Sequence, residues 1–125
     1  MHALRSDTDS NTMHMTFSGE VTVTDLSRLE RTAVVAARVL DREFVLVTDV
    51  TDCAGITESA IERIDDVVGQ LGQFGLAREV RLVGETTPDS VLQRFGRTDA
   101  DRDIALDVVD AADESSSSVP ERASR

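Results

Sequence analysis

The sequence contains no lysine, because all 13 of its basic residues are arginine. A phosphate-binding P-loop depends on a lysine, and so does the Schiff-base chemistry of pyridoxal enzymes. A receiver domain of a response regulator also uses a lysine beside its phosphorylated aspartate. The absence of this one residue type therefore argues against all three classes of protein.

Cysteine and the large aromatic residues are also scarce. The chain has one cysteine, four phenylalanines, no tryptophan and no tyrosine. A single cysteine excludes an internal disulfide and suits a reducing cytoplasm. No apolar run approaches the roughly 20 residues of a spanning helix, and the N-terminus lacks the apolar centre of a signal peptide. We expect a cytoplasmic protein with an aliphatic core and no membrane insertion.

The chain also has fewer basic than acidic residues. Aspartate and glutamate total 24, which gives a formal net charge of −11. An acidic chain without lysine is typical of proteins from salt-loving microbes, where surface charge mainly serves solvation. Nucleic-acid binding needs a basic footprint, so we expect no nucleic-acid partner.

The order of apolar patterns predicts one folded domain within the 125 residues. Residues 1–12 are polar, and the tail 111–125 is acidic and serine-rich, so both are expected to be disordered. Residues 13–110 alternate between strand and helix periods. They predict a single α/β domain, with a mostly parallel or mixed sheet of four to five strands and about three to four helices. The expected strands are 13–17, 44–50, 78–84 and 103–110, with 19–25 extended, and the expected helices are 25–41, 58–75 and 87–96.

The junction between the strand 44–50 and the following helix contains the most reactive side chains. Thr57 is the expected N-cap of the helix, with Glu58 in the first turn. Cys53 precedes a helix, where a thiol pKa tends to fall, but a phosphatase would need an arginine six residues later, and that residue is Ser59. We therefore expect Cys53 to be a small buried loop residue and predict no catalytic residues.

Four aspartates, Asp49, Asp52, Asp65 and Asp66, raise the question of a metal site. The first two end a strand, whereas the other two lie two to three turns along the next helix and point elsewhere. We therefore predict neither a metal site nor a cofactor.

Two further patterns resemble ligand motifs. Gly69, Gly72 and Gly75 form GxxGxxG inside and at the end of a helix, so we expect close helix packing and a C-cap, not dinucleotide binding. Several arginines follow or belong to the later strands and helix, and they suggest an anion site, but surface ion pairing with the abundant acidic residues is expected instead. These arginines are Arg78, Arg81, Arg94, Arg97 and Arg102.

The stretch FVLVTDVTDCAGITESAIERIDDVVGQLGQFG, followed by REVRLVG, resembles the centre of a STAS domain, the fold of bacterial anti-sigma-factor antagonists. Residues 49–52 stand where that family has Asp-Leu-Ser-Gly, and 56–61 where it has Ile-Asp-Ser-Ser-Gly-Leu. On this register Ser59 takes the position of the family's phosphorylated serine. Thr57 replaces the aspartate and Ala60 the glycine, so the family's signature is absent. The early GEVTVTD resembles divergent STAS-like proteins related to the lipid-binding Sec14 fold.

The resemblance implies a non-enzymatic protein-interaction or regulatory module acting through residues 52–61, with a protein partner or self-association. The implied interaction surface comprises Asp52, Cys53, Gly55, Thr57, Glu58 and Ser59. Ser59 and Thr57 are candidate phosphorylation sites, with helix capping as the alternative role. Two other functions stay open. One is a carrier of a small ligand or lipid, with an apolar cavity beneath the 87–96 helix. The other is a homodimer without a switch, formed through the short first strand.

Overall fold

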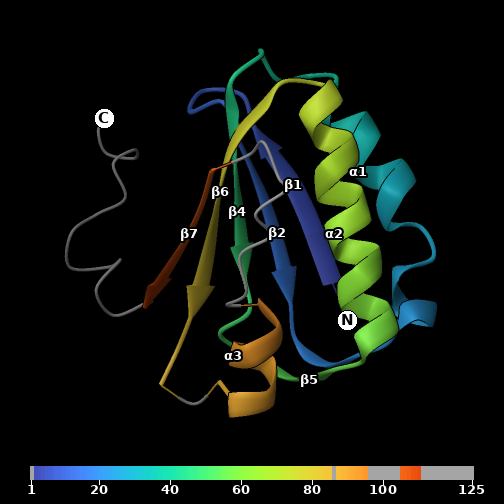
Figure 1. Cartoon of the computed structure of the whole chain (residues 1–125). Helices are drawn as coiled ribbons and strands as arrows, with labels where there is room; N and C mark the ends of the chain where they lie inside the picture. Colours follow the sequence, from blue (N-terminus) through green and yellow to red (C-terminus); the bar gives the residue numbers. More distant parts are fainter. Residues whose placement is uncertain (1, 86, 96–104, 111–125) are drawn as a thin grey trace.

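Five strands form the main sheet, and four of them run parallel. The computed structural model describes residues 2–85, 87–95 and 105–110. The strand order is β1-β2-β4-β6-β7, and β1 is antiparallel to β2. Figure 1 shows that β2, β4, β6 and β7 end at the same edge of the sheet. The strands are β1 (His2–Asp7), β2 (Thr12–Phe17), β4 (Phe44–Asp49), β6 (Leu76–Val83) and β7 (Ala105–Asp110).

Helices cover one face of this sheet, and a small second sheet lies at the edge where the parallel strands end. Helices α1 (Leu29–Ala37) and α2 (Glu58–Gln73) run side by side over the sheet (Figure 1). The short strands β3 (Gly19–Val21) and β5 (Cys53–Ile56) pair in parallel, and α3 (Asp89–Phe95) packs beside β5. A 3-10 turn, η1 (Val23–Leu26), links β3 to α1. The expected single α/β domain with a mixed sheet is confirmed. No helix within the described residues is long and apolar enough to span a membrane.

The core is mainly aliphatic, as the composition predicts, with Phe17 and Phe44 as buried aromatic residues. Phe44 and Leu46 of β4 are fully buried beneath the helices, and Val47 is buried from the other face. The apolar stripe of α2 turns toward the sheet, because Ile61, Ile64, Val68 and Leu71 recur at helical spacing and are all fully buried. The expected strand 44–50 is therefore confirmed as the central strand β4, which ends at Asp49, but Val45 and Asp49 on the face away from the helices are only half-buried.

The N-terminus differs from its expected disorder. His2–Asp7 pairs with β2 along its whole length. Leu4 packs against the core, and the hydroxyl of Ser6 donates to the carbonyl of Ala36 at 2.9 Å. The segment contributes so little apolar area that its pattern gave no signal. As a consequence the strand at 13–17 is an inner strand, and β1 is the strand at this edge of the sheet.

The expected helix 25–41 is divided. Thr22 is the N-cap of η1, and its backbone N–H donates to Asp25 Oδ2 at 3.0 Å. Helix α1 begins only at Leu29. The predicted disordered tail 111–125 and the predicted helix end at Gly96 lie outside the described residues.

One of the glycines of the GxxGxxG pattern has the expected role, and another does not. Gly75 follows the helix with a φ of +103°, which fits the predicted C-cap. Gly69 is exposed, and a Cβ added there would meet no atom within 4 Å. Close packing of the helix on the sheet therefore does not explain Gly69.

Candidate functional site

Asp49 shapes the turn that follows β4. One carboxylate oxygen, Oδ1, accepts from the backbone N–H of Thr51 at 2.9 Å and from its hydroxyl at 2.7 Å. The N–H of Cys53 then donates to the carbonyl of Val50 at 3.1 Å. An aspartate that binds the backbone two residues later favours such a turn. The carboxylate of Asp49 therefore stabilises the turn at this junction.

The next segment is a strand where sequence reasoning expected a loop. The N–H of Gly19 donates to the carbonyl of Asp52 at 3.0 Å, and the N–H of Thr57 donates to the carbonyl of Val21 at 3.2 Å. Both ends of β5 are thus bound to the segment that precedes η1. β5 has only four residues, and a glycine interrupts its apolar pattern, so its pairing with β3 was not visible in the sequence.

Thr57 caps α2, as the sequence predicted. Its hydroxyl oxygen accepts from the N–H of Ala60 at 3.2 Å, which satisfies one of the free donors at the helix start. Ser59, two residues further on, lies exposed in the first turn. The two residues therefore differ, because the hydroxyl of Thr57 caps the helix, whereas Ser59 is an exposed first-turn residue.

Most of the residues predicted for the interaction surface are accessible together. Asp52, Thr57, Glu58 and Ser59 are exposed, and Gly55 is half-buried. We call these five residues the junction surface.

Cys53 lies beneath the junction surface, with only 2% of its area exposed. Burial raises the pKa of its thiol, which therefore stays protonated at neutral pH. The thiol also lies 3.5 Å from the carbonyl of Gly55, and it contributes to the packing of the junction instead of to its exposed surface.

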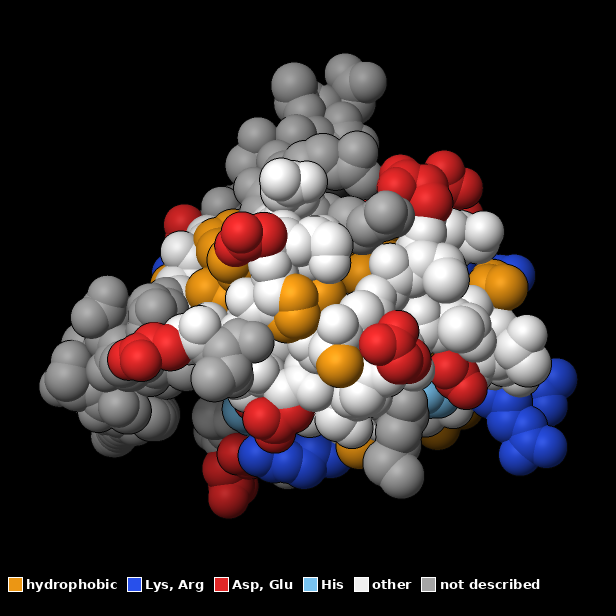
Figure 2. Space-filling view, turned by 90° about the horizontal axis from the view of Figure 1, so that it is seen from below, with side chains coloured by type: hydrophobic (Ala, Val, Ile, Leu, Met, Phe, Trp, Pro, Cys, Tyr) orange, Lys and Arg blue, Asp and Glu red, His pale blue; other side chains and the backbone are white. Residues whose placement is uncertain are grey.

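The surroundings of the junction surface are acidic. The carboxylate of Glu20 lies against Gly55, so that a Cβ added to Gly55 would come 2.6 Å from Glu20 Oε1. Asp52 and Glu58 add two more carboxylates. Figure 2, which looks onto the edge where β5 and α3 lie, shows acidic side chains spread among uncharged and hydrophobic ones, with arginines toward the margin. This end of the molecule therefore offers acceptors and small apolar patches.

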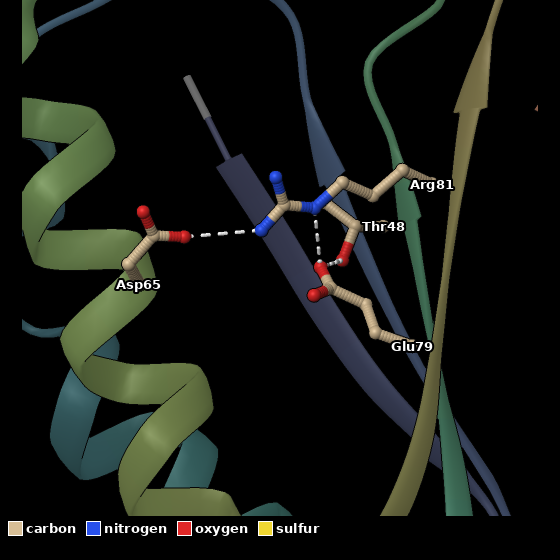
Figure 3. Close-up of polar contacts among 4 residues, drawn as sticks. All are labelled: Thr48, Asp65, Glu79 and Arg81. Carbon is tan, nitrogen blue, oxygen red and sulfur yellow. Dashed lines mark hydrogen bonds and ion pairs between the residues drawn. The ribbon is translucent and has the colours of Figure 1, made fainter. Parts of the chain in front are cut away.

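A buried charged cluster lies between strands β4 and β6 and helix α2, and the sequence did not predict it. Arg81 Nε donates to Glu79 Oε2 at 2.9 Å, and the hydroxyl of Thr48 donates to the same oxygen at 2.8 Å. Arg81 Nη2 reaches Asp65 Oδ1 on α2 at 3.1 Å (Figure 3). Arg81 was predicted to belong to a solvated surface, yet it is 1% exposed. Only the spacing of Glu79 and Arg81 in EVRLV could have suggested the buried pair, because side chains two residues apart in a strand lie on the same face.

The four aspartates considered for metal binding serve separate roles. Asp49 binds Thr51, Asp65 binds Arg81, and Asp52 and Asp66 are exposed on different elements. Within the described part of the chain, no group of three or more His, Cys, Asp or Glu is placed to hold a metal ion.

The other arginines singled out in the sequence are partly accounted for. Arg78 forms an exposed ion pair with Asp107 on β7, as expected for surface pairing. The side chain of Arg94 and all of Arg97 and Arg102 lie outside the described residues.

Comparisons with known proteins place the fold. The chain is similar to the structure of the anti-sigma factor antagonist SpoIIAA in its unphosphorylated form, with a TM-score of 0.64 and 11% identity over 98% of this chain and 99% of that chain. It is also similar to an uncharacterised DUF3478 protein with a SpoIIAA-like fold from Shewanella loihica, with a TM-score of 0.56 and 13% identity over 87% of this chain and 84% of that chain. No family model matches the sequence, and no curated protein matches it significantly. These likenesses establish a SpoIIAA-like, and so STAS-like, fold, as the resemblance predicted.

Proposed function

We propose that this chain is a non-enzymatic regulatory module that binds a protein partner through the junction surface. The observation that carries the proposal is the exposure of Asp52, Thr57, Glu58 and Ser59 together at a hydrogen-bonded strand-to-helix junction. Support also comes from the fold, because the similar SpoIIAA is an anti-sigma factor antagonist, a protein that acts on another protein. The buried, protonated thiol of Cys53 fits a module without a nucleophile.

Ser59 is the residue whose modification would control this contact. A phosphate in the first turn of a helix meets free N–H groups and the positive end of the helix dipole. The similar SpoIIAA is described in an unphosphorylated form, which points to the same kind of modification. Thr57 is the less suitable phosphorylation site. Its hydroxyl oxygen already accepts a hydrogen bond from the N–H of Ala60, and a phosphate there would remove this helix cap.

Added charge at Ser59 is expected to weaken partner binding. A phosphate or carboxylate there would lie beside Glu58 and would lose its hydration when the partner covers it. Ser59→Asp should therefore weaken the contact, whereas Ser59→Ala should preserve it.

A pull-down from the native organism's lysate in molar salt tests the proposal. The tagged wild-type chain should recover one defined protein, and Ser59→Asp should lose it. Ser10→Asp is a matched control, because Ser10 is an exposed serine in the turn between β1 and β2, at the other end of the sheet (Figure 1). Recovery of no partner, or equal recovery by the Ser59→Asp variant, would contradict the proposal. Mass spectrometry of the native protein then checks Ser59 for phosphate.

The carrier alternative has less support. It would need an apolar cavity beneath α3, and Val91 on that helix is fully buried in the hydrophobic core. Self-association cannot use the strand 13–17 as predicted, because β1 covers its edge, so at this side of the sheet it would use β1 instead. Light scattering of the purified chain would detect such a dimer directly.

A further inference from the structure

Helix α1 presents a basic outer face. Its inner residues Leu29, Ala33 and Ala37 are buried against the sheet. Arg31 lies on the opposite side of the helix and is exposed, as is Val35, with 59% of its area accessible. Arg28 and Arg38, at the two ends of α1, continue the same stripe, because residues three and four apart share a face.

This stripe borders an open hollow of about 600 Å³, which we call the α1 groove. Three arginines, one serine and two valines line it together with Glu30. These residues are Ser27, Arg28, Arg31, Val34, Val35 and Arg38. The groove combines the positive charge of its arginines with the accessible apolar area of its valines. An outer helix face that only contacts water does not need such valines.

The three arginines of the α1 groove form no ion pair with any described residue. Among the described residues, Arg63, Arg78 and Arg81 do lie beside carboxylates, whereas the exposed Arg5 and Arg42 also have no ion pair. Arg63 lies 3.7 Å from Glu30, and Arg81 lies 3.1 Å from Asp65. Glu30 also lines the groove, but its carboxylate is paired with Arg63 of α2. Three guanidinium groups along one helix face outnumber this single acid among the described lining residues and favour an anionic group supplied from outside.

We propose that the α1 groove binds a short acidic segment of a partner protein, whose carboxylates pair with Arg28, Arg31 and Arg38. An apolar side chain of the same segment covers Val34 and Val35, which a nucleic-acid backbone would leave exposed. The net charge of −11 repels an extended polyanion such as a membrane surface more than a short peptide with few charges. The groove lies on α1 and not on the junction surface, so this proposal does not depend on the proposed function.

Fluorescence anisotropy with a labelled synthetic peptide tests the inference. The probe is a helical peptide of about 15 residues, long enough to populate a helix, with glutamates and leucines on one face. Wild-type protein should bind it, and Arg31→Glu should weaken binding about tenfold or more, because a buried arginine contact is a frequent hot spot. Arg5→Glu is the matched control, because it changes net charge equally from the exposed strand β1. Val35→Ser, which keeps the charge, should also weaken binding.

Each other result overturns the inference. If the wild-type chain does not bind the peptide, the groove is not a peptide site. Equal losses for Arg5→Glu and Arg31→Glu would mean that diffuse charge, and not the groove, is responsible. Unchanged binding by Val35→Ser, together with Arg31-dependent binding to phosphatidylglycerol vesicles, would assign the groove to anionic surfaces instead. Circular dichroism confirms that each exposed substitution leaves the fold intact.

Discussion

Arg81 Nε lies 2.9 Å from Glu79 Oε2, although these two side chains are 1% and 0% exposed. Thr48 on β4 donates to the same carboxylate, and Asp65 on α2 receives the other end of the guanidinium. The cluster therefore joins two strands and a helix through charged groups in the interior. Such a pair is sensitive to the loss of either member, because the remaining charge would stay buried without a partner of opposite sign.

Arg81→Met is expected to destabilise the fold by about 3–5 kcal/mol, because it leaves the Glu79 carboxylate buried without its guanidinium. The double variant Arg81→Met, Glu79→Leu should recover most of this loss. Urea unfolding followed by circular dichroism measures both. Asp65→Asn is the control, and because Asp65 is half-exposed its loss should cost about 1 kcal/mol or less. A single Arg81 variant as stable as wild type would show that the cluster does not hold α2 to the sheet.

Thr57→Ala should lower the free energy of unfolding by about 0.5–2 kcal/mol, because the N–H of Ala60 loses its acceptor at the start of α2. Thr57→Ser keeps a hydroxyl at the same place and should stay close to wild type. Thermal unfolding of the pair compares the two substitutions. A Ser variant as unstable as the Ala variant would mean that the methyl group of Thr57, and not its cap, matters.

Cys53 should react slowly with a thiol reagent in the folded protein at neutral pH. Burial raises the pKa of its thiol, so the reactive thiolate is rare, and the side chain is also shielded from the reagent. Labelling of the folded protein should accelerate as the pH rises toward the raised pKa. Labelling of the denatured chain should already be fast at a pH near the ordinary pKa of a thiol. Rates from mass spectrometry measure this, and rapid labelling of the native chain at neutral pH would contradict the burial of Cys53.

Two glycines flanking the end of α2 should respond to alanine in opposite directions. Gly69→Ala should stabilise by about 0.5–1 kcal/mol, because the position is helical, exposed and has open space for a Cβ. Gly75→Ala should destabilise, since its φ is +103° and the new Cβ would lie 2.8 Å from the Cα of Arg42. Paired urea titrations test both, and equal effects of the two substitutions would contradict these backbone assignments.

The sequence predicted the central features because their physical signals are local. The run FVLVT favours a buried strand, and Thr57 followed by a periodic apolar stripe favours a helix start. β1 escaped prediction because Leu4 is its only large apolar residue, and its pairing with β2 arises from backbone hydrogen bonds that any polar strand can make. The partners of Arg81 escaped for a different reason, because Thr48 and Asp65 are distant in sequence and only the parallel pairing and α2 bring them together.

A short segment of chain connects the junction surface to the α1 groove. Val21 accepts from the N–H of Thr57, Thr22 caps η1, and the groove begins at Ser27. A ligand that shifts β3 at either surface would therefore change the affinity at the other, and by thermodynamic reciprocity each ligand would alter the other's binding by the same factor. Titrating the acidic peptide with and without the junction partner would measure that factor, and a value of one would mean that the two surfaces act independently.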